Sequence, residues 1–372
     1  MTPSRRRVLR AGVVAAGALL AGCTDVDTTT VPSTATPSTT RDTPNRTTDG
    51  TTTTDADGTA TPPYAAPSAY ETTTLSLSAT ADCSLGATLT VPEGDGPFPG
   101  AVIVHGSGPQ DRDGTTGPVK PYRDIARGLS TYGVAVLRYD KRTVACTGTL
   151  DPAALSLDDV VTDDALTALE RLREHDRVAA GDSVVVGHSL GGALAPRIAS
   201  RDGQVAGVAM LAANARPLPD LIVAQNRYAL ERDGELTDAE RRQLRQVRAL
   251  AERLRTVDIE SGEVLAGAGR PFWRGLAEYD QVAATEGLSL PMFLAQGTRD
   301  RQVSPGDDFG QWRDAIGGRG NVLTRSYDGL NHYFVDGAGA LETGGNPEAG
   351  VVDRQVVVDL AAWVEEVTDG NV

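Results

Sequence analysis

The sequence predicts an α/β protein in which helices cover both faces of a mostly parallel β-sheet. Six short apolar runs, each of the length of a buried strand, recur after residue 100. They occupy residues 101–104, 134–139, 183–186, 205–211, 291–295 and 322–327. Segments with apolar residues at helical spacing separate these runs, and this alternation is typical of a parallel sheet.

Two of the intervening segments have a clear apolar stripe at helical spacing. The stripes consist of Val161, Ala165, Leu169 and Leu172 in one segment and of Val356, Leu360, Trp363 and Val367 in the other. Ser304 followed by Pro305 is typical of a helix cap and the first helical residue. Before the first apolar run, residues 74–90 alternate apolar and polar side chains around residues 84–86, so we expect a β-hairpin there.

The alternation of strands and helices stops between Ala212 and Ser289. Residues 237–240 form a capping-box sequence at the start of a helical segment. Its apolar stripe consists of Leu244, Val247, Leu250 and Leu254. An insertion of this length is usually an active-site lid, so we expect a helical cap at about 213–289. The alternative is a helical decoration remote from any site.

The N-terminus is typical of an export signal. Three arginines at 5–7 precede an apolar run at 11–20, which is shorter than the roughly 20 residues of a membrane span. Residues 4–9 resemble a twin-arginine signal, and residues 20–23 resemble the lipobox at which lipoprotein precursors are cleaved and lipidated. We therefore expect lipidation at Cys23. The alternative is a chance cysteine after a Sec signal that is cleaved elsewhere.

A Thr-, Ser- and Pro-rich segment at residues 23–73 follows the expected signal peptide at residues 1–22. This segment has few large apolar side chains, so we expect a disordered stalk. Asn45 and the threonines are candidate glycosylation sites, and a bare solvated spacer is the alternative. Residues 74–372 would then form the folded domain, held at the membrane by the N-terminal lipid on the outer surface of the cell.

The formal net charge is -15, and only two of the 35 basic residues are lysines. A surface this acidic disfavours nucleic acid and anionic lipid headgroups as partners. Concentrated salt screens the repulsion among such charges, so the acid excess and the scarcity of lysine indicate a halophilic host.

A glycine-flanked serine follows the predicted strand at 183–186. The motif is Gly187-His188-Ser189-Leu190-Gly191. A serine on the sharp turn between a strand and a helix needs glycine neighbours to avoid clashes, and this nucleophile elbow exposes the hydroxyl above the sheet. We therefore expect Ser189 to be a nucleophile.

A serine nucleophile needs a base, and the chain has only four histidines. Two of them belong to glycine motifs and a third ends a helical segment, which leaves His332 after the last predicted strand. A carboxylate after the strand at 291–295 would hold the tautomer of the imidazole, and Asp300 has this position. Asp307 and Asp308 are the competing acids, but capping of the following helix accounts for them.

Two backbone segments are expected to form an oxyanion hole. The His-Gly-Ser-Gly loop at 105–108 follows an early strand, and its small residues let the N–H groups of Gly106 and Ser107 approach a developing oxyanion. Leu190, the residue after the nucleophile, would provide the second donor. His105 itself is better explained as a buried hydrogen-bonding residue than as a catalyst.

Five segments together resemble the esterase family that is related to dienelactone hydrolases and to the catalytic domains of prolyl oligopeptidases. They are residues 105–113, 137–143, 187–191, 296–303 and 330–332. The resemblance runs from about residue 74 to the C-terminus and implies the α/β-hydrolase fold and activity on short-chain esters. It also implies a catalytic triad of Ser189, Asp300 and His332. Arg301 stands where an aromatic residue is common in that family.

Two groups of residues have open alternatives. Asp140, Lys141 and Arg142 end a strand at the edge of the sheet that carries the site, where they would bind an anionic group of a substrate. An ion-paired loop anchor is the alternative. Cys83 and Cys146 are the cysteines left after lipidation, and they form either a disulfide, which export permits, or two buried thiols.

The sequence therefore predicts a serine hydrolase that cleaves small to medium acyl esters through an acyl-enzyme, without a metal ion or an organic cofactor. One alternative is an exported serine peptidase related to prolyl oligopeptidases, although no internal repeats indicate the propeller that such peptidases usually carry. The other is a non-catalytic lipoprotein that binds a ligand in the same pocket, although a binding protein has no need of a complete triad.

Overall fold

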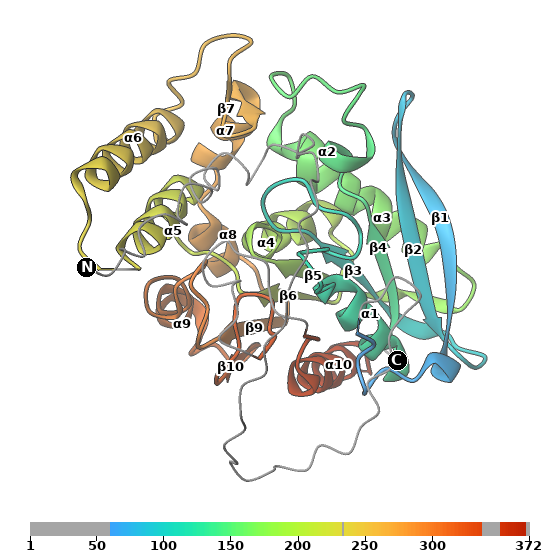
Figure 1. Cartoon of the computed structure of the whole chain (residues 1–372). Helices are drawn as coiled ribbons and strands as arrows, with labels where there is room; N and C mark the ends of the chain where they lie inside the picture. Colours follow the sequence, from blue (N-terminus) through green and yellow to red (C-terminus); the bar gives the residue numbers. More distant parts are fainter. Residues whose placement is uncertain (1–59, 233, 337–349, 370–372) are drawn as a thin grey trace, which may run out of the picture.

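A computed structural model of the chain describes residues 60–232, 234–336 and 350–369. In this part of the chain an eight-stranded sheet has the order β1-β2-β4-β3-β5-β6-β9-β10. Neighbouring strands from β4 to β10 are parallel, whereas β1, β2 and β4 pair antiparallel (Figure 1). The predicted mostly parallel sheet is therefore confirmed. The predicted signal peptide, Cys23 and most of the predicted stalk lie outside the described residues.

Each of the six predicted apolar runs coincides with or overlaps a strand. The strands of the large sheet are β1 (Tyr70–Thr80), β2 (Cys83–Pro92), β3 (Phe98–Val104), β4 (Ala135–Tyr139), β5 (Val178–His188), β6 (Gly207–Leu211), β9 (Met292–Gly297) and β10 (Val322–Tyr327). β4, β6 and β9 are buried along their whole length, because helices cover both of their faces. β10 lies at one edge of the sheet, opposite β1, and is partly exposed.

The predicted N-terminal hairpin is present, but its turn does not lie at 84–86. Residues 81–82 connect β1 to β2, and residues 84–86 pair within β2. Gly86 lies within β2, and the strand has a glycine at this position because the side chain of Arg112 covers it. A Cβ at Gly86 would lie 1.9 Å from Arg112 Nη2, so the glycine marks a close approach rather than a turn.

The folded domain begins before the predicted boundary at residue 74. β1 starts at Tyr70, within the predicted stalk. The aromatic ring of Tyr64 belongs to the hydrophobic core, and its hydroxyl donates to the Val352 carbonyl oxygen over 2.8 Å. One large aromatic residue thus fixes the end of a polar segment to the domain.

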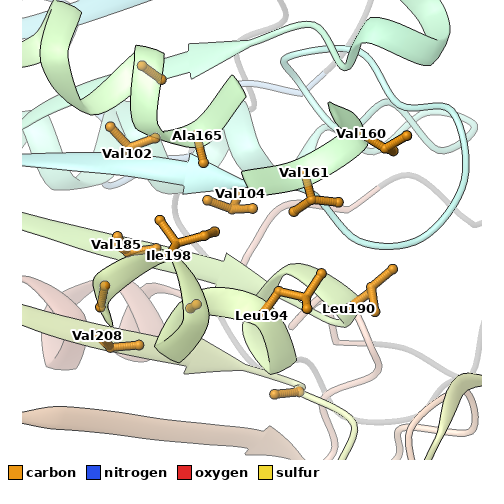
Figure 2. Packing of buried hydrophobic residues seen from close by; sticks show 14 of the residues in the cluster. Val102, Val104, Val160, Val161, Ala165, Val185, Leu190, Leu194, Ile198 and Val208 are labelled. Atoms are coloured by element: carbon orange, nitrogen blue, oxygen red, sulfur yellow. The ribbon is translucent and has the colours of Figure 1, made fainter. Parts of the chain in front are cut away.

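Helices cover the sheet in two layers. Outside the insertion, the helices and short helical turns are α1 (Pro121–Thr131), α2 (Arg142–Ala145), α3 (Asp163–Arg173), α4 (Leu190–Asp202), α9 (Gly310–Ile316), α10 (Arg354–Asp369), η1 (Pro67–Ala69), η2 (Asp158–Thr162) and η3 (Pro305–Phe309). Apolar residues of α1 and α10 form one core with one face of the sheet. Those of α3, α4 and α9 form a second core with the other face. Figure 2 shows Leu194 and Ile198 of α4 packed with Val185 of β5. Both predicted apolar stripes face these cores, and Ser304 caps η3 as predicted, accepting from Asp307 N over 3.0 Å.

The insertion between β6 and β9 contains α5 (Leu218–Glu231), α6 (Asp238–Arg255), β7 (Val264–Leu265), β8 (Ala268–Gly269), α7 (Arg270–Ala277) and α8 (Gln281–Glu286). The predicted capping box is present at the start of α6: Glu240 N donates to Thr237 Oγ1 over 3.3 Å, and the Glu240 carboxylate accepts from Thr237 N over 2.7 Å. α5 and α7 pack on α6, and α8 packs on α4 (Figure 1). No helix in the described ranges is both long and apolar enough to cross a membrane.

Cys83 and Cys146 form a disulfide, with their Cα atoms 5.7 Å apart. The bond joins the start of β2 to the end of α2 across 63 positions of the chain. Closing a loop of this size in the unfolded chain stabilises the folded state by about 4 kcal/mol in the chain-entropy model. Of the two states considered for these cysteines, the structure has the disulfide.

Candidate active site

Four loops meet at the carboxyl edge of the parallel strands. They follow β3, β5, β9 and β10, and the last three carry Ser189, Asp300 and His332. β3 and β5 are neighbours in the sheet, yet β4 lies between them in the chain and pairs on the far side of β3. A sheet forms a crevice at such a switch in strand order, and Ser189 lies directly above it.

Ser189 lies on a strained turn between β5 and α4. Its backbone angles, φ 55° and ψ -122°, are rare for residues with a side chain. The flanking glycines allow close approach of the backbone. A Cβ on Gly187 would lie 2.2 Å from the Gly191 carbonyl oxygen, and one on Gly191 would lie 2.4 Å from the His105 carbonyl oxygen. This turn has the geometry of a nucleophile elbow.

Asp300 and His332 form a buried hydrogen-bonded pair. His332 Nδ1 lies 2.7 Å from Asp300 Oδ2. The second carboxylate oxygen of Asp300 accepts from the backbone N–H groups of Gln302 and Val303, over 2.8 and 2.9 Å. Gln296 Nε2 donates to Oδ2 as well, over 2.8 Å. An ionised carboxylate can accept hydrogen bonds but cannot donate them. Nδ1 of the His332 imidazole therefore carries the proton, and Nε2 is left as the basic nitrogen.

The competing acids have other partners. Asp308 is fully buried and accepts from Arg216 Nη2 over 2.7 Å and from Ser304 N over 3.0 Å. Asp307 is exposed and lies 3.4 Å from Arg216. Both side chains belong to the start of η3, and Asp300 is the carboxylate at His332.

His188 links the elbow to the loop that carries His332. Its Nε2 donates to the His332 carbonyl oxygen over 2.9 Å, and the two ring centroids are 4.6 Å apart. Burial, and then the nearby His332, lowers the pKa of His188 to about 3, so its ring is neutral. A neutral ring that donates from Nε2 accepts at Nδ1, where the hydroxyl of Tyr122 lies at 3.0 Å.

Gly106 does not supply an oxyanion-hole donor, contrary to the sequence-based expectation. Its N–H donates to the Tyr122 hydroxyl over 3.1 Å. The N–H groups of Ser107 and Leu190 make no hydrogen bond with any residue that the structure describes. These two are the candidate donors. Gly106 instead allows the loop after β3 to approach Ser189 closely, since a Cβ at Gly106 would lie 3.1 Å from Ser189 Cβ.

His105 is a buried residue of the loop after β3. Its ring packs edge-on against Tyr139, with centroids 4.8 Å apart. Burial, and then the charge of Lys141, lowers the pKa of His105 to about 3. The ring is therefore neutral and shapes the loop.

The three charged residues after β4 differ in their environments. Asp140 accepts from Arg112 Nε and Nη2, over 3.0 and 2.6 Å. Arg142 donates to Asp164 from Nε and Nη2, over 2.9 and 2.6 Å. These bidentate pairs anchor the loop and occupy both side chains. Of the three, Lys141 lines the large cavity described below, and the other two are not part of its wall.

Leu190 borders a large and a small cavity. The larger has a volume of about 450 Å³, is mostly apolar and lies between the loop after β3 and the insertion, which contributes Val264 and Phe272. Lys141 is the one charged residue of its wall in the described chain. The smaller, about 130 Å³, lies between the first turns of α4 and the helices α5 to α8. The insertion therefore packs on the side of the sheet edge that carries Ser189.

Two residues of the site escape prediction from the sequence. Tyr122 in α1 connects Gly106 to His188, and Gln296 at the end of β9 holds Asp300. Gln296 is only four positions from Asp300, so its place directly before the acid-bearing loop is a usable signal. Tyr122 lies in an ordinary amphipathic helix, and no local pattern distinguishes it.

The comparisons with known proteins agree with this geometry. A family model described as "Alpha/beta hydrolase family" matches residues 101–342. The chain belongs to the alpha/beta hydrolase family. It is also similar to Esterase EstD of Thermotoga maritima, with 36% identity over 303 residues, which cover 82% of this chain and 69% of EstD.

Solved structures of other α/β hydrolases resemble the fold. Est1E from Butyrivibrio proteoclasticus is 16% identical with a TM-score of 0.51 and covers 79% of this chain and 98% of its own. A lipase in an open form is 21% identical with a TM-score of 0.52 and covers 80% of this chain and 100% of its own. At these identities the likeness concerns the α/β-hydrolase fold alone.

Proposed function

We propose that this α/β hydrolase is a serine carboxylesterase in which Ser189, His332 and Asp300 form the catalytic triad. The observation that carries the proposal is the buried 2.7 Å contact between His332 Nδ1 and Asp300 Oδ2, on loops adjacent to a strained serine turn. The 36% identity to an esterase over most of the chain supports ester hydrolysis as the reaction.

The triad would act through an acyl-enzyme. Ser189 Oγ attacks the ester carbonyl carbon and passes its proton to His332 Nε2, while Asp300 stabilises the imidazolium. The N–H groups of Ser107 and Leu190 stabilise the oxyanion. His332 then protonates the leaving alcohol as the C–O bond breaks. Water attacks the acyl-enzyme with His332 as base, which releases the carboxylic acid and restores Ser189.

The large cavity supports an apolar group of small to medium size in the substrate. Its volume of about 450 Å³ is within the range of small-molecule sites, about 300–1,000 Å³. Its wall includes Leu155, Val160 and Phe272, and it adjoins Leu190, the residue after the nucleophile. The cavity can therefore hold an acyl chain whose carbonyl lies at Ser189.

A comparison of p-nitrophenyl esters with matched p-nitroanilides tests the reaction class. The ester has the better leaving group, so we expect a carboxylesterase to prefer it strongly. The Ser189→Ala variant should lose ester hydrolysis almost completely, while Ser200→Ala, a serine of α4 that donates to the Pro196 carbonyl oxygen, should keep it. Efficient anilide cleavage would instead favour a peptidase.

We further propose that the enzyme is exported and anchored by a lipid on Cys23. The signal-like residues 4–9 and the lipobox-like residues 20–23 support export and lipidation. The disulfide between Cys83 and Cys146 supports an oxidising compartment independently of the signal.

A further inference from the structure

Lys141 lies buried between the active site and the large cavity. It follows β4 and directly precedes α2, and only 3% of its surface is exposed. Its Nζ donates to the Gly106 carbonyl oxygen over 2.7 Å. No carboxylate of the described ranges lies within ion-pair distance of the ammonium. The buried ammonium of Lys141 therefore acts mainly on the peptide group that contains the Gly106 carbonyl.

The Gly106 carbonyl belongs to the peptide unit that also contains the Ser107 N–H. This peptide is planar and trans, so its C=O and N–H point in opposite directions. By holding the oxygen, Lys141 fixes the direction of the Ser107 N–H. The peptide begins at Gly106, where an added Cβ would lie 3.1 Å from Ser189 Cβ, and its N–H is one of the two candidate oxyanion donors.

The other backbone group of Gly106 is held as well. Its N–H donates to the Tyr122 hydroxyl over 3.1 Å, so side chains from α1 and from the loop after β4 hold the glycine on both sides. A positive charge on the carbonyl oxygen also draws electron density from the peptide. Its N–H becomes a stronger donor, because hydrogen bonds in a chain polarise one another.

Lysine at this position contrasts with the rest of the chain, which has two lysines among 35 basic residues. The neighbouring Arg138 and Arg142 donate to the carboxylates of Asp113 and Asp164. A guanidinium fits the two oxygens of a carboxylate, whereas a compact ammonium fits a single acceptor. The cation that faces a backbone carbonyl is the lysine.

We propose that Lys141 is a positioning residue for the oxyanion hole, which orients and polarises the Gly106–Ser107 peptide toward the tetrahedral intermediate. This inference rests on the proposed function. Lys141 acts on the transition state through the peptide, so its loss lowers kcat and leaves KM nearly unchanged.

The charge of Lys141 also gives the reaction a pH dependence. Burial lowers its pKa to about 8, and Asp164 from α3 opposes this shift. His105, which faces it from the loop after β3, is neutral at pH 7, and Asp140 is neutralised by Arg112. The ammonium therefore loses its proton at mildly alkaline pH, and kcat of the wild type should decline above about pH 8.

The test measures kcat and KM for p-nitrophenyl butyrate between pH 6 and 10 in the wild type, Lys141→Met and Lys120→Met. Methionine keeps the unbranched shape and most of the length of the side chain without the charge. We expect Lys141→Met to lose roughly 10 to 100-fold in kcat at pH 7, somewhat less than removal of a whole donor, with KM changed by less than threefold. The alkaline decline should disappear in this variant. Lys120→Met, the other lysine, should behave as the wild type.

A rescue experiment separates charge from packing. In Lys141→Ala, propylammonium should enter from the adjoining cavity and restore kcat at least tenfold, whereas butanol should not. A kcat of Lys141→Met within threefold of the wild type would overturn the proposal, as would a raised KM with unchanged kcat. If the variants fail to fold, a wild-type kcat that stays constant from pH 7 to 10 overturns it. Full activity of Ser189→Ala would overturn the proposed function instead.

Discussion

At the scale of single residues, Asp300 determines which nitrogen of His332 carries the proton. Two backbone N–H groups and the amide of Gln296 donate to its carboxylate, in addition to His332. With every donor directed at oxygen, the carboxylate keeps His332 protonated on Nδ1 and basic on Nε2. The loop after β9 therefore sets the orientation of His332, the proposed base.

Asp300→Asn should reduce kcat/KM for p-nitrophenyl butyrate by about 10⁴-fold, because an amide favours the wrong tautomer of the histidine. The folded structure should persist, since asparagine has nearly the same shape. Asp307→Asn is the matched control, because Asp307 is exposed and near Arg216. A loss of less than tenfold for Asp300→Asn would show that Asp300 does not orient the base.

His188 should make the free energy of unfolding depend on pH. Its folded-state pKa, about 3, lies below the ordinary value of 6.5, so the unfolded chain binds a proton that the folded protein does not. This stabilisation is complete above pH 6.5 and is lost as the pH falls toward 3. Between pH 7 and pH 4, urea unfolding should show that the wild type loses about 3 kcal/mol more than His188→Gln. Equal losses would mean that His188 titrates normally in the folded protein.

The positions of candidate residues with local motifs could be predicted, and contacts with distant partners could not. Ser189 is marked by its glycines, and His332 by its place after the last strand. Gly106 looked equally well marked as an oxyanion donor, but the hydroxyl of Tyr122, 16 positions later, occupies its N–H. Only the packing of α1 against the loop after β3 determines that contact.

At the scale of elements, the insertion between β6 and β9 shapes the large cavity. The β7–β8 hairpin and α7 contribute Val264 and Phe272 to its wall. Phe272 is buried, whereas Val264 is exposed to 43% and lies at the rim. The insertion therefore provides one wall of the cavity in which we propose that the acyl chain binds.

Val264→Trp should narrow the cavity and reduce kcat/KM for p-nitrophenyl octanoate at least tenfold, with little effect on the acetate. An acetyl group does not reach the rim, whereas a longer chain must pass the new indole. Ala249→Trp, on the exposed face of α6, is the control for an added tryptophan. An unchanged ratio of octanoate to acetate would place the acyl chain elsewhere.

Element boundaries follow the sequence where a physical signal is local. The capping box at Thr237 sets the start of α6, and Ser304 caps η3. The predicted position of the hairpin turn is wrong because a glycine at position 86 is typical of a turn. The reason for this glycine is instead the side chain of Arg112, which lies over the strand. A glycine alone does not distinguish a turn from a close approach.

At the scale of the whole molecule, the fold class follows from buried strands that alternate with helices. The order of the strands does not follow from composition, and neither does the disulfide, because Cys83 and Cys146 meet only when α2 packs beside β2. The family match and the sheet topology agree on the same architecture.

Cys23→Ser tests the proposed anchor of the full chain. Without the thiol there is no site for the lipid, so the protein should appear in the medium or stay as an unprocessed precursor. Membrane fractions of the native host, probed by immunoblot and N-terminal sequencing, give the readout. A variant that is still membrane-bound with the wild-type mature N-terminus would contradict lipid anchoring at Cys23.

The identity of the nucleophile is the central claim, and active-site labelling tests it most directly. The wild-type protein is treated with a fluorophosphonate, digested and mapped by mass spectrometry, in parallel with Ser189→Ala and Ser200→Ala. We expect a single phosphonylated residue, Ser189, in the wild type and in Ser200→Ala, with loss of esterase activity in proportion to labelling. Ser189→Ala should take up no label. Labelling of another residue, or an active Ser189→Ala enzyme, would contradict the account.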